Sequence, residues 1–211
     1  YLANFVASIF AAGKPEDGFA GKTLVIGGDG RFYNDTAIQL VIKMAVAQGF
    51  ARILIGQNGI LSTPAVSHII RKYGAFGGVI LSASHNAGGP DGDFGIKFNM
   101  SNGGPAPEKI TDAIYAYSQT VSSYAAADCA DVDLSQLGTT MIGDVSVEII
   151  NSVTDYVELM QELFDFDAIR ALFASGFTLK FDAMHAVTGP YAHAIFEDLL
   201  GAAKGSVFNG T

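Results

Sequence analysis

The sequence predicts an α/β protein whose mixed, mainly parallel sheet is sandwiched by helices, followed by the start of a second, similar α/β domain. Three short apolar runs, at 23–26, 52–55 and 78–81, indicate buried strands, and helical patterns separate them. Alternating strands and helices with short connections favour parallel pairing through right-handed crossovers. Nearly half of the 211 residues are hydrophobic, which is enough for a sizeable core.

The first half of the chain contains the elements of this sheet. The helices are indicated by apolar residues at helical spacing, by capping residues or proline at their starts, and by glycine at their ends. A short apolar run that carries one lysine predicts a fourth strand. We expect helices at 1–12, 34–48 and 63–74, and the fourth strand at 94–99.

The second half leads into another domain. We expect a helix after Pro107, a surface excursion at 122–137, a strand at 140–150 that leaves the domain, helices at 154–164 and 167–173, a strand at 177–181, a loop at 182–189 and a helix at 190–200. The last strand–loop–helix unit has no expected return strand and cannot bury its own faces. The predicted domains are therefore 1–152 and a truncated second domain at 153–211.

Composition limits the classes of function. The net charge of −9 argues against a general nucleic-acid surface, and no apolar run is long enough to span a membrane. A single cysteine, Cys129, excludes an internal disulfide and fits the cytoplasm. An anionic small substrate remains compatible with this charge because a few focused cations can dominate one cleft.

The loop that follows the third strand concentrates reactive side chains. Ser84, His85 and Asn86 come directly after the strand, and four glycines follow within the next nine residues. In parallel sheets the ligand site lies outside the carboxyl ends of the strands. The loop at 27–31 follows the first strand at the same edge, so the topology predicts that Arg31 lies near Ser84.

Two cations complement this serine. Lys97 stands between Ile96 and Phe98 just beyond the glycine loop, a position suited to acid–base chemistry. Arg31 follows glycines at a strand end, where its guanidinium suits a phosphate. Either residue alone would be a weak signal, because an outward lysine or a glycine turn explains each equally well.

Rival sites are less convincing. Ser84 and His85 could suggest a serine hydrolase, but adjacent side chains diverge and no Gly-x-Ser-x-Gly elbow occurs. Asp91 and Asp93 could suggest a metal site, although carboxylates in glycine loops more often make turn hydrogen bonds. The other histidines lack close metal-ligand spacing: His68, His185 and His193.

Three motifs resemble one family. The stretch Ser82–Asn99, SASHNAGGPDGDFGIKFN, closely resembles the phosphoserine loop of the phosphoglucomutases, in the α-D-phosphohexomutase superfamily. Gly27–Tyr33, GGDGRFY, resembles an early phosphate-contacting loop of that family, and Asp182–Tyr191, DAMHAVTGPY, resembles the opening of its second domain. The resemblance covers essentially the whole chain and implies the fold of phosphohexomutase domain 1 plus the start of domain 2.

The resemblance also implies roles and partners. Ser84 would be the phosphorylated serine and a ligand of Mg²⁺ through a phosphate oxygen. Lys97 would be a general acid/base, His85 would support the phosphoserine, and Arg31 and Asn86 would bind phosphate. The reaction would interconvert glucose 1-phosphate and glucose 6-phosphate through glucose 1,6-bisphosphate, an isomerase-class phosphotransfer, and the remaining metal ligands and C-terminal domains would lie outside this chain.

Two departures and two alternatives accompany the resemblance. Ala87 replaces a usual proline, and Ser82 replaces a usual threonine. The long glycine loop favours the glucose branch over the phosphomannomutases and phosphoglucosamine mutases, and a non-catalytic phosphosugar-binding module is the alternative from another class. Because the family's metal and sugar-selecting loops do not occur here, we expect the chain alone to have little or no mutase activity.

Overall fold

The computed structural model describes residues 1–210, which form two compact units, Tyr1–Ile150 and the residues from Asn151 onward. In the first unit the elements are α1 (Leu2–Gly13), β1 (Thr23–Gly28), α2 (Asn34–Gln48), β2 (Arg52–Ile60), α3 (Thr63–Lys72), β3 (Gly77–Leu81), β4 (Ile96–Met100), α4 (Glu108–Ser118), β5 (Gly138–Ile142) and β6 (Val145–Ile150).

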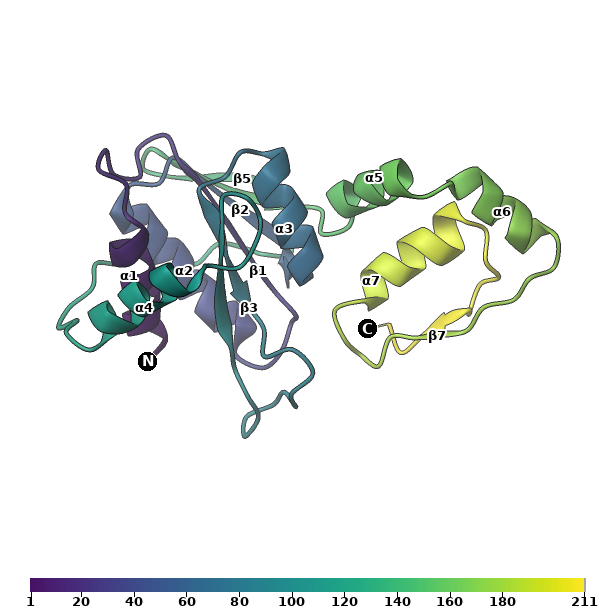
Figure 1. Cartoon of the computed structure of the whole chain (residues 1–211), viewed down its shortest axis with the longest axis horizontal. Coiled ribbons are helices and arrows are strands. Elements are labelled where there is room, and N and C mark those ends of the chain that lie inside the picture. Colours follow the sequence, from purple (N-terminus) through teal and green to yellow (C-terminus); the bar gives the residue numbers. More distant parts are fainter. Residues whose placement is uncertain (211) are drawn as a thin grey trace. The chain divides into compact units, whose positions relative to one another are not determined.

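A six-stranded mixed sheet with the order β4-β3-β1-β2-β6-β5 forms the centre of the first unit (Figure 1). The strands β3, β1, β2 and β6 pair in parallel, while β4 and β5 pair antiparallel at the two edges. The predicted fold class, a mainly parallel sheet between helices, is confirmed. The order places the carboxyl ends of β1 and β3 beside each other.

Alternation along the strands buries both faces of this sheet. Leu24 and Ile26 belong to the main core with residues of α1, α2 and α4, which cover one face. The intervening Val25 and its neighbours Leu54 and Ile80 are equally buried toward the other face, which α3 covers. The outcome is a three-layer unit in which the strand-end loops emerge at one edge.

Two expectations in this unit were wrong, and one strand has a shifted boundary. The strand predicted at 140–150 is a hairpin, and β6 does not leave the domain but pairs in parallel with β2. The excursion at 122–137 is not only surface, because Val132 and Leu134 are buried in the core and Asn58 N–H donates to the Leu134 carbonyl. The fourth strand begins at Ile96 rather than at residue 94.

The second unit contains α5 (Thr154–Leu163), α6 (Phe166–Ala174), β7 (Phe181–Asp182), α7 (Gly189–Ala192), the π-helix η1 (His193–Leu199) and β8 (Val207–Phe208). The strand predicted at 177–181 is reduced to β7, and the unit does have a return strand, since β8 pairs with β7 in parallel. The buried Glu197 carboxylate accepts a hydrogen bond from Val207 N–H at 2.9 Å and so connects η1 to β8.

Candidate functional site

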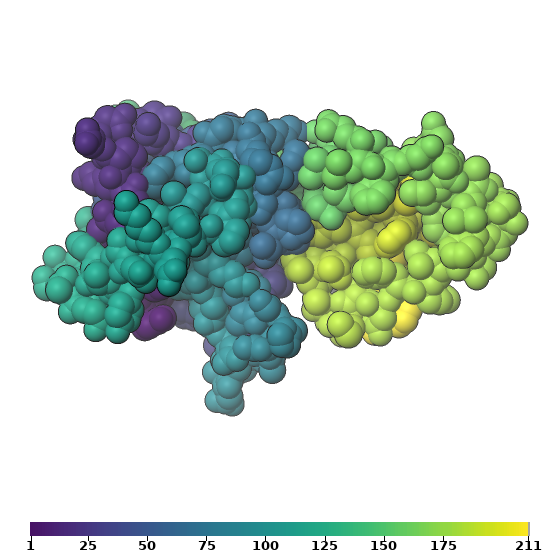
Figure 2. Space-filling view, in the orientation of Figure 1, coloured from purple at the N-terminus to yellow at the C-terminus, as the bar shows by residue number. Residues whose placement is uncertain are grey.

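The backbone of Ser84 departs from ordinary geometry at the end of β3. Its φ of +56° lies in the left-handed region, which non-glycine residues rarely occupy. Such outliers persist only where the surrounding structure holds them, and they concentrate at functional sites. The residue is exposed, and the loop that follows projects from the body of the first unit (Figure 2).

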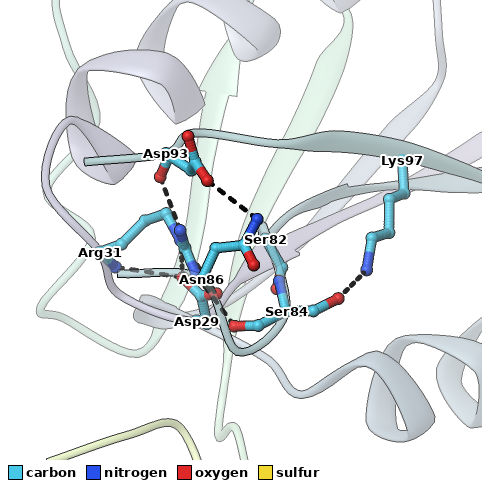
Figure 3. Close-up of polar contacts among 7 residues, drawn as sticks. All are labelled: Asp29, Arg31, Ser82, Ser84, Asn86, Asp93 and Lys97. Carbon is cyan, nitrogen blue, oxygen red and sulfur yellow. Dashed lines mark hydrogen bonds and ion pairs between the residues drawn. The ribbon is translucent and has the colours of Figure 1, made fainter. Parts of the chain in front are cut away.

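Lys97 reaches Ser84 from the adjacent antiparallel strand. The pairing sets Lys97 opposite Ile80, and its Nζ donates a hydrogen bond to Ser84 Oγ at 2.9 Å. Figure 3 shows the Lys97 ammonium pointing at the Ser84 hydroxyl. Both residues are exposed, so a ligand can approach the hydroxyl and the ammonium together. Both residues were predicted to belong to one site, and in the structure they are in direct contact.

Lys97 also lines a hollow of about 820 Å³ within the first unit. The walls of this hollow come from β4, from the start and middle of α3, and from α1 and α4. The polar residues that line it include Ser67, Asn99 and Thr111. Lys97 therefore borders both the strand-end loop and this hollow.

Arg31 lies close to Ser84, as the sheet topology predicted. Its Nη2 donates to the Ser84 carbonyl at 3.2 Å and its Nη1 to the Asp93 carbonyl at 2.6 Å. Its Nε and Nη2 also pair with the Asp29 carboxylate, at 2.9 and 2.8 Å. Only 7% of the Arg31 side chain is exposed. Because most of its donors are engaged within the chain, a role in binding phosphate stays a prediction.

Sequence reasoning missed two residues of this site. Asp29 accepts from both the guanidinium and the backbone N–H of Arg31, and Ser82 Oγ accepts from the Ser84 N–H at 3.0 Å. The spacing of Asp29 two residues before Arg31, in a glycine turn, is typical of an Asx turn and was the available signal. For Ser82 the sequence offers no comparable signal beyond its place in the motif.

The remaining predicted residues have different outcomes. The Asn86 amide donates to the Asp93 carboxylate at 2.8 Å, which closes the base of the loop tip. His85 is exposed and lies outside this hydrogen-bond network, so its ring does not pair with the Ser84 hydroxyl as a serine hydrolase would require. Asp93 serves the turn, as expected for a carboxylate in a glycine loop.

Burial and hydrogen bonding act oppositely on Asp29. Burial raises the pKa of its carboxyl, but hydrogen bonds from Arg31 and from the Ser82 hydroxyl outweigh burial and hold the pKa below its ordinary value. The carboxylate is therefore charged at neutral pH. A charged Asp29 keeps Arg31 in its bidentate arrangement.

The described residues do not form a complete site for the Mg²⁺ that the motifs imply. Across residues 1–210 no group of three or more His, Cys, Asp or Glu side chains could hold a metal ion. No helix in this part of the chain is long and apolar enough to cross a membrane.

The fold and the loop together define a class. A three-layer unit with a serine loop at its strand ends agrees with the family model described as "Phosphoglucomutase/phosphomannomutase, alpha/beta/alpha domain I", which matches residues 1–125. The chain therefore belongs to the phosphoglucomutase/phosphomannomutase family, and the resemblance predicted from the motifs is confirmed.

Particular relatives are named as phosphoglucomutases. Over its full length the chain is 60% identical to phosphoglucomutase of Rhizobium radiobacter and 54% identical to the chloroplastic phosphoglucomutase of Arabidopsis thaliana. It also matches the open form of pp63/parafusin from Paramecium, with a TM-score of 0.92 and 42% identity over the whole chain. The chain spans 38%, 34% and 40% of these three proteins.

Proposed function

We propose that this chain forms the phosphoserine-bearing part of a phosphoglucomutase, an isomerase that interconverts glucose 1-phosphate and glucose 6-phosphate. The observation that carries the proposal is the 2.9 Å contact between Lys97 Nζ and Ser84 Oγ at an exposed strand end. The names of the relatives support it. In this proposal residues 1–152 are the phosphoserine domain and residues 153–211 are the linker helices and the start of a second domain.

The proposed chemistry consists of two phosphoryl transfers, each of a different phosphoryl group. In the first step the bond from Ser84 Oγ to phosphorus breaks while a hydroxyl oxygen of the sugar phosphate bonds to phosphorus, giving glucose 1,6-bisphosphate. The sugar hydroxyl loses a proton and Ser84 Oγ gains one. In the second step Ser84 Oγ loses its proton and bonds to the other phosphorus, while the bond from that phosphorus to the sugar oxygen breaks and the sugar oxygen gains a proton, leaving glucose 6-phosphate. Lys97 touches the oxygen that gains and loses the proton, so it is the general acid/base of the proposal.

Phosphoryl transfer depends mainly on positioning and on neutralising charge. The Lys97 ammonium supplies a positive charge beside the transferred group, and His85 and Asn86 are exposed next to it. Arg31 has five N–H donors, of which four already bond within the chain, so one Nη1–H remains for a phosphate oxygen. We propose that His85, Asn86 and Arg31 also contact the phosphate, each contributing less than Lys97.

The metal enters the proposal only through Ser84. A phosphate oxygen on this residue is the one ligand that the chain would contribute to Mg²⁺, and the other ligands would belong to the rest of the enzyme. Since these residues do not complete a metal site, no step proposed here depends on the metal.

We also propose a cytoplasmic location, on the ground of the single cysteine, although the Arabidopsis relative is named as chloroplastic.

Intact-mass measurement tests the phosphoserine. After incubation of the enzyme that contains this chain with glucose 1,6-bisphosphate, we expect a gain of one phosphoryl group, and we expect the Ser84→Ala enzyme to gain none. Lys97→Met should slow the gain by about a hundredfold, the scale of acid–base catalysis. Because Lys97 is exposed, the melting temperature of this variant should match the wild type. A phosphate that persists on Ser84→Ala would contradict the proposal.

The chain by itself should turn over little substrate. It spans 38% of the Rhizobium relative, so the groups that bind the sugar's other end are proposed to lie elsewhere in the enzyme. A coupled assay from glucose 1-phosphate to glucose 6-phosphate should therefore show activity near background. Normal turnover would contradict this. Preference of the enzyme for mannose 1-phosphate or glucosamine 1-phosphate would favour the other branches, and phosphosugar binding without phosphorylation would favour a non-catalytic module.

A further inference from the structure

We propose that Asp29 is the positioning residue of the Ser84 loop: it holds Arg31 and Ser82, and these two side chains hold the backbone of Ser84. The inference rests on the proposed function, because it concerns how the phosphoryl-carrying serine is kept in place. Figure 3 shows Asp29 and Arg31 together with Ser82, Ser84 and Asp93 of the loop.

The pairing between Asp29 and Arg31 is the foundation of this arrangement. Arg31 Nε lies 2.9 Å from Asp29 Oδ1 and Nη2 lies 2.8 Å from Oδ2, a bidentate pair. The Asp29 side chain is 15% exposed and the Arg31 side chain 7% exposed, so water and salt screen this ion pair less than they screen a surface ion pair. Asp29 Oδ1 also accepts the Arg31 backbone N–H at 3.2 Å, which fixes the turn.

Arg31 then holds the loop at two distant points. One donation goes to the carbonyl of Ser84, near the start of the loop, and another to the carbonyl of Asp93, near its end. A guanidinium has rigid planar geometry, so fixing one edge with Asp29 also fixes the direction of the other donors. The two loop ends are thereby held at a constant separation.

Ser82 supplies a second connection from Asp29 to the serine. Its hydroxyl hydrogen bond lowers the pKa of Asp29, and its oxygen accepts the Ser84 N–H at 3.0 Å. A hydroxyl has one donor and can accept as well, so both bonds coexist. The φ of +56° at Ser84 is an uncommon conformation for a non-glycine residue, and these contacts hold it in place.

The decisive variant is Asp29→Asn. An amide presents an NH₂ group to the Arg31 donors, so the bidentate pair cannot form, while the size of the side chain is kept. We expect hydrogen exchange of peptides covering 83–95 to accelerate by roughly tenfold or more, and peptides of β1 and β2 to accelerate far less. The matched control is Asp112→Asn, an exposed aspartate on α4, which should leave the loop unchanged.

A second pair of variants tests the hydroxyl. Ser82→Ala removes the oxygen that holds the Ser84 N–H, so the loop should exchange faster here too. Ser82→Thr restores a hydroxyl at the same position and should rescue slow exchange. This rescue separates positioning from a mere loss of packing, and it keeps the test available if Asp29→Asn fails to fold.

The outcomes decide between the two proposals. Unchanged loop exchange in both Asp29→Asn and Ser82→Ala would overturn the positioning role, as would acceleration spread evenly over the first unit. The phosphorylation rate of Ser84, measured on the same samples, should fall in Asp29→Asn and recover in Ser82→Thr relative to Ser82→Ala. If the wild-type enzyme that contains this chain accepts no phosphate on Ser84, the proposed function fails, while the exchange data still judge the positioning role.

Discussion

At the scale of single residues, the site depends on backbone held in unusual positions. Ser84 lies in the left-handed region, and the hydroxyl of Ser82 and the guanidinium of Arg31 both contact its backbone. The arginine that the motif presents as a phosphate ligand is largely occupied in supporting the loop. The reactive atoms, Ser84 Oγ and Lys97 Nζ, are the exposed part of a site whose support is mostly buried.

Gly95 should be intolerant of a side chain. A Cβ at this position would lie 2.3 Å from the Ser82 carbonyl oxygen, closer than any real Cβ contact, so the backbone of the loop would have to move. We expect Gly95→Ala to reduce the free energy of unfolding by about 1–3 kcal/mol, in the range of overpacking, as measured by urea denaturation.

The matched control for this variant comes from the same loop. A Cβ at Gly88 would meet only the Arg31 Cβ, at 3.4 Å, which is an ordinary contact. Gly88→Ala should therefore leave the free energy of unfolding within about 0.5 kcal/mol of the wild type. Equal losses in the two variants would show that any alanine in the loop is harmful and would remove the steric explanation.

Much of the residue-level site could be predicted, but its hydrogen bonding could not. Because β1 and β3 were expected to be parallel, their following loops had to share an edge, and this placed Arg31 near Ser84. The partners of Arg31 depend on side-chain rotamers and loop closure, which no periodicity reports. For the same reason Asp29 and Ser82 were passed over, although both stand inside the motifs that were recognised.

At the scale of elements, the second half of the first unit differed most from expectation. The alternation through residues 140–150 does not distinguish one long strand from a hairpin, because both faces keep the same period of two. Nor does it show whether the strand joins the existing sheet. The pairing of β6 with β2 is non-local, and β8 is only two residues long, so neither leaves a strong signal in the sequence.

Because β6 lies inside the sheet, truncating a buried side chain on this strand should destabilise the first unit. Val147 is fully buried in the main core, so Val147→Ala should lower the free energy of unfolding by about 2 kcal/mol through lost burial and a cavity. Met141 on β5 is 59% exposed, and Met141→Ala should change the free energy of unfolding by less than about 0.5 kcal/mol. Denaturant titrations in which both variants resemble the wild type would contradict the pairing of β6.

At the scale of the whole molecule, carboxylates with lowered pKa values occur in both units. Asp29 is one in the first unit. In the second, Glu197 has its pKa lowered chiefly by the hydrogen bond from Val207 N–H, with burial opposing and His193 assisting. A carboxyl whose pKa is lower in the folded state stabilises that state above its ordinary pKa, and this contribution is lost as the pH falls through the lowered value.

Acid should therefore weaken each unit through a different residue. We expect the melting temperature, followed by circular dichroism, to fall as the pH drops from about 5 toward about 2, the range in which paired carboxylates take up protons. Asp29→Asn and Glu197→Gln should each flatten this dependence, because an amide does not titrate, while starting from a lower stability at neutral pH. A variant whose acid limb is as steep as the wild type's would show that its carboxyl does not contribute.

Backbone hydrogen bonds close the serine loop at its base, and this affects how the loop can change during evolution. Ser82 N–H bonds to the Gly95 carbonyl at 2.9 Å directly beyond the last sheet pair, and Asp93 N–H bonds to the Ala87 carbonyl at 2.8 Å nearer the tip. Residues added or removed between Ala87 and Asp93, the pair nearer the tip, would alter only the entropy cost of closing the loop, which grows slowly with loop length. Evolution can therefore vary the tip, and with it the reach toward different substrates, while the sheet and the serine stay as they are.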